Sequence, residues 1–118
     1  MQPLLEITVK MVPQNKTIYI KYHLTADERR DLVNTIGDAG VLLMEYLYRL
    51  GSVGNLQISD EHIAEYFGWN IHKAKRVRLA LIKHGWFAQS KYRINHKKKG
   101  ITYYIGREAV AKHNIHSD

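Results

Sequence analysis

The stretch EYFGWNIHKAKRVRLALIKHGWF, from Glu65 to Phe87, decides the fold. It begins with one acid and contains no other carboxylate, although surface helices usually mix both signs of charge. Gly68 stands where one helix must end and another begin, because glycine adopts the left-handed conformation that ends a helix without a Cβ clash. Asn70 is placed to cap the second helix, which we expect to run to His84, with Gly85 after it.

The apolar residues around this turn recur at helical spacing. At about 100° per residue, three of them fall together on one side of the second helix and form its core stripe. They are Ala74, Val77 and Leu81. In the preceding helix, Ile63 and Phe67 face the same core, and Ala64 leaves room for the second helix to cross nearby. Trp69 is expected to fill the corner between the two helices.

Two alternating segments precede the helices. LEITVKMV places Leu5, Ile7 and Val9 on one face, and TIYIKYHL repeats the pattern with Ile18 and Ile20. Alternation of this kind is typical of half-buried strands. The short loop between the segments predicts a β-hairpin over residues 1–24, with one apolar face and one face that can meet water.

The cap signals predict three helices upstream of the turn. Thr25 and Glu28 have the spacing of a capping box. Gly37 interrupts that helix, and a second helix over AGVLLMEYLYRL is expected to start at a cap on Asp38 and to end at Gly51. A third short helix, capped by residue 59 or 60, should end at the central turn.

The C-terminal part predicts a second hairpin. WFAQSKYRI and ITYYIG read as strands, and NHKKKG between them reads as a tight basic loop, with Gly100 available for a positive φ. REAVAKH predicts a short terminal helix. We therefore expect one α+β domain over 1–118: a hairpin at 1–24, helices at 25–85 that include a helix-turn-helix at 60–84, a hairpin at 86–106 and a helix at 107–114.

Charge is segregated along the chain. Residues 1–65 hold nine acids and six Lys or Arg, whereas residues 66–118 hold two acids and twelve Lys or Arg. No acid lies between Tyr66 and Arg107. Solubility alone does not require this concentration in one half, so the pattern favours a binder of polyanions such as nucleic acid.

Several classes of function are disfavoured by composition. The chain has no cysteine, which excludes disulfides and thiolate zinc sites, and its seven histidines form no tight pair on one helix. No Gly-rich phosphate loop, serine elbow or carboxylate pair appears, so we expect no enzyme, no cofactor and no metal. No apolar run approaches the roughly 20 residues of a membrane span, and the N-terminus lacks signal-peptide features. A cytoplasmic protein without membrane contact is expected.

The ordered set of features resembles the winged helix-turn-helix superfamily. The residues that carry the resemblance are Ile63, Ala64, Phe67, Gly68, Trp69, Ala74 and Val77, followed by a hairpin with a basic tip. The resemblance covers about residues 39–106. The chain departs from it in two ways: Ile71 stands where many members have a phosphate-binding Ser or Thr, and the N-terminal hairpin is an addition to the common fold.

The resemblance implies that the outer face of the second helix enters the major groove of DNA. His72 and Arg76 are expected to read base edges, and Lys73 and Lys75 to contact phosphates. Asn70 either reaches a base or only caps the helix, and Arg78, beside the core stripe, is expected to be structural. The further expected DNA contacts are Lys83 on the same helix and Lys91, Arg93, His96, Lys97, Lys98 and Lys99 on the hairpin, or wing.

The expected function is sequence-specific binding of double-stranded DNA, in transcriptional regulation or as an accessory factor in phage or plasmid replication, partition or conjugation. A winged helix that binds an acidic protein partner is the alternative, and RNA binding is a weaker one. A solvated basic face would also explain the charge.

The tyrosines raise the possibility of base stacking, as in proteins that bind single strands. Tyr103 and Tyr104 alternate along one strand, so at most one of them could face solvent. A homodimer is a further expectation, with the N-terminal hairpin or the first helices at its interface.

Overall fold

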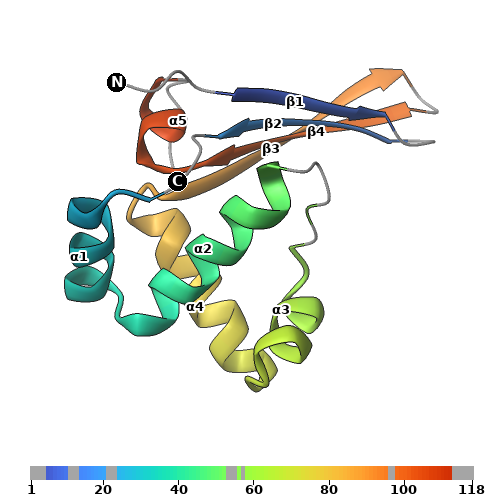
Figure 1. The fold of residues 1–118 in the computed structure, drawn as a ribbon. Helices are drawn as coiled ribbons and strands as arrows, with labels where there is room; N and C mark the ends of the chain where they lie inside the picture. Colours follow the sequence, from blue (N-terminus) through green and yellow to red (C-terminus); the bar gives the residue numbers. More distant parts are fainter. Residues whose placement is uncertain are drawn as a thin grey trace.

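The computed structural model of the 118-residue chain describes residues 5–10, 14–20, 24–52, 56, 58–95 and 98–112. The described residues form an α+β fold of five helices and a four-stranded mixed sheet. The elements are β1 (Leu5–Lys10), β2 (Gln14–Ile20), α1 (Ala26–Thr35), α2 (Asp38–Ser52), α3 (Asp60–Phe67), α4 (Ile71–Lys83), β3 (Phe87–Asn95), β4 (Lys98–Ile105) and α5 (Arg107–Lys112). Helices α1–α4 lie on one face of the sheet and α5 on the other (Figure 1). This arrangement is compatible with a winged helix.

The sheet joins the two ends of the chain. Its strand order is β1-β2-β4-β3, with two antiparallel hairpins, β1–β2 and β3–β4, as the sequence predicts. Strands β2 and β4 pair in parallel and bring Ile18 opposite Tyr103 and Ile20 opposite Ile105. The N-terminal hairpin therefore extends the C-terminal hairpin, and β4 becomes a central strand with a neighbour on each side.

The basic loop of the second hairpin is shorter than predicted. Asn95 pairs with Lys98, and Gly100 lies within β4 opposite Tyr92, so the placement of Gly100 in a turn was wrong. The physical reason is the central position of β4. Gly100 is also paired with Asn15 of β2, so hydrogen-bonded partners on both sides extend the strand toward the tip.

Gly51 lies inside α2 and does not end it, which corrects a second prediction. A Cβ at this position would lie 2.8 Å from Cδ1 of Ile105 and 3.0 Å from Cδ1 of Ile20. The missing side chain lets the last turn of α2 lie directly on the sheet, and the helix continues to Ser52. Close packing against the strands therefore outweighs the low helix propensity of glycine.

The start of α2 also differs from the prediction. The capping box at Thr25 and Glu28 is confirmed for α1, but Asp38 is the first helical residue of α2 rather than its cap. Gly37, with φ at 110°, makes the turn between the two helices. The carboxylate of Asp38 still lies in the first turn, where the helix dipole favours a negative charge.

One end of the second face of the sheet is covered by α5 (Figure 1). Tyr104 and Ala88 form a small buried cluster with Ala109 and Val110 of α5. The ring of Tyr19 stacks on that of Tyr104 at 5.5 Å between centroids, so at Tyr19 the face that was predicted to be able to meet water is partly buried. Tyr103 and Tyr104 do lie on opposite faces of β4, and both are buried. Neither offers an exposed ring for base stacking.

Candidate nucleic-acid interface

The tight turn between α3 and α4 forms as the sequence predicts. Gly68 adopts the left-handed conformation at φ 71°, and the backbone N–H of Trp69 donates to the carbonyl of Ala64 at 2.9 Å. Ser59, rather than Asp60, caps α3, because its hydroxyl accepts from the N–H of residue 62 at 3.1 Å. Local caps thus fix where each helix begins and ends.

The corner between these helices is filled by aromatic rings. Ile63 is fully buried, and Trp69 stacks on Phe67 with 4.5 Å between ring centroids and 16° between planes. The core stripe of α4 is confirmed: Ala74, Val77 and Leu81 are all buried. This packing fixes the rotation of α4 about its axis, so the side of the helix away from the core is free to contact a ligand.

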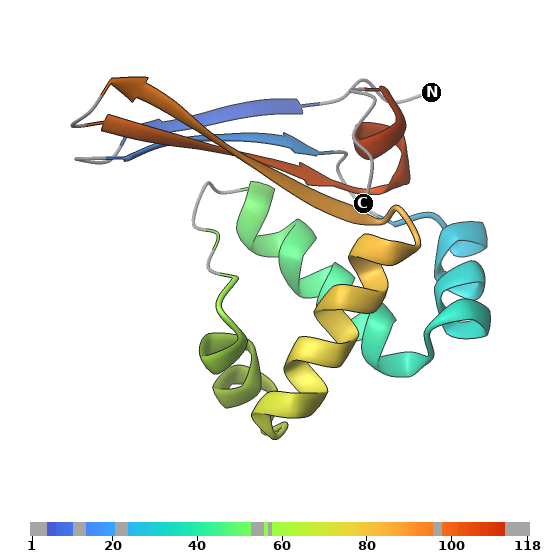
Figure 2. The same ribbon diagram turned by 180° about the vertical axis from the view of Figure 1, so that it is seen from behind.

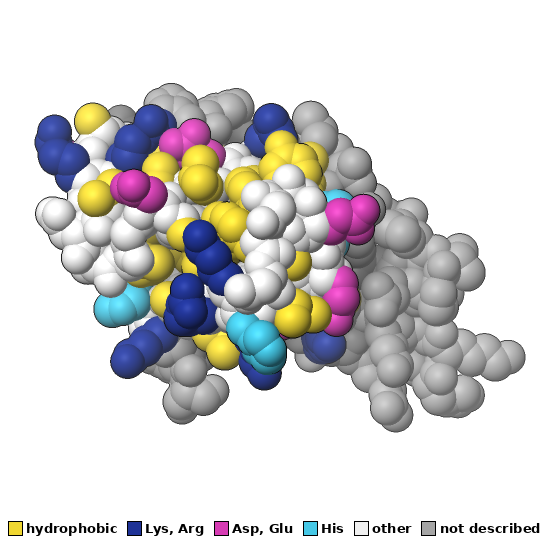
Figure 3. All heavy atoms as spheres, turned by 90° about the horizontal axis from the view of Figure 1, so that it is seen from below, with side chains coloured by type: hydrophobic (Ala, Val, Ile, Leu, Met, Phe, Trp, Pro, Cys, Tyr) yellow, Lys and Arg dark blue, Asp and Glu magenta, His cyan; other side chains and the backbone are white. Residues whose placement is uncertain are grey.

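The outer side of α4 is basic. Figure 2 shows α4 across the front of the helical layer, with the sheet above it. His72, Lys75, Arg76 and Lys83 are exposed on it. Figure 3, a view onto the end of the molecule that carries α3 and α4, shows Lys, Arg and His side chains over the centre and lower part of this face and acidic side chains at its margins. The grouping of these cations on one surface was predicted from helical periodicity.

Two of the predicted residues have local partners. The Asn70 side-chain oxygen accepts the backbone N–H of Lys73 at 2.8 Å, which confirms its role as a cap. The ammonium of Lys73 lies 4.9 Å from the centroid of the Trp69 ring, a cation–π contact that draws this side chain toward the corner. Lys73 is half-buried and lies at the margin of the basic face rather than at its centre.

Arg78 is structural, as predicted. Its Nε donates to Oδ1 of Asp60 at 2.7 Å and its Nη2 donates to Oδ2 at 3.2 Å, so the guanidinium holds the carboxylate with two bonds. The hydrogen bonds from Arg78 are the main cause of the lowered pKa of the Asp60 carboxyl. The pair links the first turn of α3 to the middle of α4, and Asp60 lies close enough to Lys75 for that ammonium also to lower the pKa of the carboxyl.

The predicted wing residues are described in part. Lys91 is exposed on β3, which is an end strand of the sheet in the strand order. The backbones of Arg93, Lys98 and Lys99 lie in β3 and β4, whereas His96 and Lys97 lie outside the described residues. In Figure 2 the β3–β4 hairpin extends from the end of α4 beyond α3. The hairpin is thus attached to the C-terminal end of the basic helix.

Sequence reasoning missed Leu79 on the same face, and it noted Ile71 only as a departure from the superfamily pattern, without a role of its own. Ile71 and Leu79 are large apolar side chains that stay 42% and 46% exposed. The helical wheel contains the signal, because it places Leu79 about 180° from the core stripe and among the basic residues. The prediction assigned ligand contacts only to the charged and polar residues of this helix.

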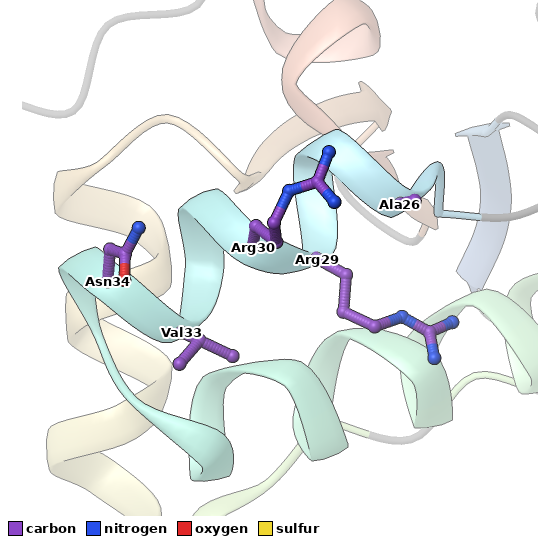
Figure 4. Close-up of a pocket in the computed structure, with 5 residues that line it drawn as sticks. All are labelled: Ala26, Arg29, Arg30, Val33 and Asn34. Atoms are coloured by element: carbon purple, nitrogen blue, oxygen red, sulfur yellow. The ribbon is translucent and has the colours of Figure 1, made fainter.

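Two surface hollows lie away from this face. One, of about 560 Å³, is lined by α1 residues Ala26, Arg29, Arg30, Val33 and Asn34, and the two guanidinium groups diverge from each other (Figure 4). Arg29 reaches Glu45 of α2 at 3.4 Å, and Arg30 pairs with Asp27. The other hollow lies between α2 and α3, where Arg49 donates to the hydroxyl of Tyr66.

No helix among the described residues is long and apolar enough to cross a membrane. Within the same residues, no group of three or more His, Asp or Glu side chains could hold a metal ion. Comparison with family models, curated proteins and solved structures found no match to the chain. The assignment of a function therefore depends on the geometry and charge of the chain itself.

Proposed function

We propose that this chain is a winged-helix protein that binds double-stranded DNA in a sequence-specific manner. In this proposal α4 enters the major groove and the β3–β4 hairpin lies along the sugar–phosphate backbone. The observation that carries the proposal is the outer face of α4, where His72, Lys75, Arg76 and Lys83 are exposed. The one acid that pairs with α4 among the described residues, Asp60, binds Arg78.

The electrostatic argument is local as well as global. The chain carries no acid from Tyr66 to Arg107, so the charges of α4 and of the wing are not balanced by their sequence neighbours. A surface on which cations outnumber acids attracts a polyanion and releases the counterions condensed on DNA. The acids on the same end of the molecule lie at the margins of the face (Figure 3).

The proposed roles follow from position along α4. His72 and Arg76 are one helical turn apart near the start of the helix, which is the part of a recognition helix that usually contacts base edges. The guanidinium of Arg76 can donate two parallel hydrogen bonds to the O6 and N7 acceptors of guanine. The ammonium of Lys75, beside it, supplies a point charge for phosphate. Lys83, in the last turn, and Lys91, on the wing, extend the positive surface toward the sheet.

Arg76→Ala is the direct test of sequence-specific binding. When duplexes are selected from a random pool, the Arg76→Ala variant should show no preference at one base pair that the wild type selects. The loss of discrimination at that base pair should be about 1–3 kcal/mol. Lys75→Ala should instead weaken binding to every duplex alike. Arg30→Ala is the matched control, because Arg30 is an exposed arginine that pairs with Asp27 on α1. Selection of an unchanged motif by Arg76→Ala would remove Arg76 from the base-reading residues.

A second candidate function is a winged helix that binds an acidic protein. The apolar exposure of Leu79 on the basic face favours it, because protein interfaces combine apolar cores with charged rims. Titration of a duplex at two salt concentrations separates the two functions. For a DNA-binding protein, log K for the duplex should fall linearly as log[salt] rises. A protein-binding module should bind no duplex near physiological salt.

We also propose that the protein acts as a homodimer. Strand β1 ends the strand order of the sheet, and no further strand pairs with it among the described residues. An edge strand presents unpaired backbone groups to another chain. Sedimentation at micromolar protein should give twice the mass of the chain, and a monomer that protects one half-site would contradict the proposal.

A further inference from the structure

Two apolar side chains on α4 lie outside the buried stripe of the helix and stay partly exposed. Ala74, Val77 and Leu81 are buried and make the contact of α4 with the rest of the protein. Ile71 and Leu79 remain 42% and 46% exposed on the outer side. Single exposed apolar side chains are common on proteins, but Leu79 lies among the exposed cations, and Ile71 lies at the edge of the same basic surface, at the first residue of the helix.

The two side chains form one row on the helix. Ile71, Lys75 and Leu79 are spaced four residues apart, so successive members turn by about 40° and stay on the same side. His72 and Arg76 form the adjacent row. Because an α-helix rises about 1.5 Å per residue, the two apolar side chains are about 12 Å apart along the helix axis. They bracket the residues proposed to read bases.

The surrounding charge favours an anionic occupant that also presents apolar groups. The helical neighbours of Leu79 at spacings of three and four residues include Lys75, Arg76 and Lys83, all of which are exposed. A partner that presented a purely apolar surface would have to remove water from these cations without replacing it. The major groove of DNA offers apolar groups between two walls of phosphate, and these groups are the C5-methyl groups of thymine.

We propose that Ile71 and Leu79 read thymines through their methyl groups, an inference that rests on the proposed DNA-binding function. The methyl group is the one apolar mark in the major groove that distinguishes thymine from the other bases. The 12 Å span corresponds to about three to four base pairs at 3.4 Å per pair. The preferred site should therefore contain two thymines at this separation, on either side of the base pair read by Arg76.

Deoxyuridine tests this proposal because it removes the methyl group of thymine and keeps its base pairing. Each thymine of the duplex recovered by selection is replaced singly, and binding is measured by titration. At two positions, replacement should lower the affinity of the wild-type protein for the duplex about fourfold, the amount expected for one buried methyl-sized group. Replacement of thymines outside these two positions should change nothing.

Variants assign each methyl group to one side chain. Leu79→Ala should lose discrimination between thymine and deoxyuridine at one position and keep it at the other, and Ile71→Ala should do the reverse. Leu79→Met, which retains an apolar contact, should keep discrimination at both positions. Because both side chains are exposed, the variants should melt at nearly the same temperature as the wild type, which circular dichroism checks.

The outcomes separate the inference from the proposed function. A wild-type protein that binds no duplex would refute the DNA-binding function itself. A protein that selects a motif but binds thymine and deoxyuridine equally well at every position would overturn the inference and leave the function standing. Undiminished discrimination by both Leu79→Ala and Ile71→Ala would also overturn it, and would leave the apolar row free for a protein partner.

Discussion

The ion pair between Asp60 and Arg78 is expected to stabilise the junction of α3 and α4. The perturbation is Asp60→Asn, which keeps the shape of the side chain and removes its charge. In the wild type, Nε and Nη2 of Arg78 lie 2.7 and 3.2 Å from the two carboxylate oxygens of Asp60. In the variant, both N–H groups lose their charged acceptor. The guanidinium remains in a site where 22% of its side chain is exposed, so water replaces the carboxylate only in part.

The magnitude follows from this partial burial. Hydrogen bonds to charged groups contribute about 1.5–3 kcal/mol, whereas exposed ion pairs contribute about 0–1 kcal/mol. With the Asp60 side chain 18% exposed, the pair lies between these limits, and we expect a coupling energy of about 1–2 kcal/mol. For a domain of this size, a loss of that amount should lower Tm by about 3–8 °C.

The pH dependence of stability has a definite sign. The folded protein holds the pKa of Asp60 below its ordinary value, so the charged carboxylate stabilises the fold. This contribution is complete above the ordinary pKa of about 3.9 and is lost as pH falls through the lower folded-state pKa. Asp60→Asn should therefore lose stability at neutral pH and should show a shallower loss than the wild type below about pH 4.

A double-mutant cycle with Asp60→Asn and Arg78→Met, followed by urea denaturation, measures the coupling. The matched control is the cycle of Asp27→Asn and Arg30→Met, because that pair is 88% and 72% exposed and should couple by less than about 0.5 kcal/mol. Equal coupling energies in the two cycles would refute the reasoning that burial and two bonds distinguish the Asp60 pair. An unchanged acid limb in Asp60→Asn would refute the assigned pKa shift.

Three further predictions concern the turns, the buried tyrosines and the wing. Gly106→Ala should destabilise the fold by more than about 1 kcal/mol, because φ is 103° and a Cβ would overlap the Tyr48 hydroxyl; Gly68→Ala, at φ 71° with open space, should cost less in the same denaturation assay. Burial raises the pKa of Tyr48, so the neutral hydroxyl stabilises the folded protein at every pH below the ordinary tyrosine pKa of about 10, and this stabilisation is lost as pH rises through the raised pKa. Ultraviolet difference absorbance should show Tyr48 ionising at a higher pH than an exposed tyrosine. Replacement of lysines 97–99 by alanine should make the slope of log K against log[salt] shallower by about 0.9 for each lysine that neutralises a phosphate, and an unchanged slope would show that none of the three does so.

The candidate interface was largely predictable because helix caps and helical periodicity are local. The outer face of α4, the Gly68 turn and the structural role of Arg78 all follow from spacing along one short segment. The exposed pair Ile71 and Leu79 was also present in that spacing. Charge alone does not reveal its role, because Leu79 lies between cations on the helical wheel and Ile71 lies at the first helical position.

By itself the sequence determined where α1 and α4 begin, that α3 ends at Gly68, which residues of α4 are buried and that the chain forms a hairpin before the helices and another after α4. The tertiary structure alone decided that β2 pairs in parallel with β4, that α2 continues through Gly51 and that α5 covers Tyr104. The physical reason is the range of the interactions. A cap or an alternating strand is stabilised by neighbours a few residues away, whereas strand partners, the fate of a helical glycine and the cover of a sheet depend on segments from opposite ends of the chain that meet only in the folded protein.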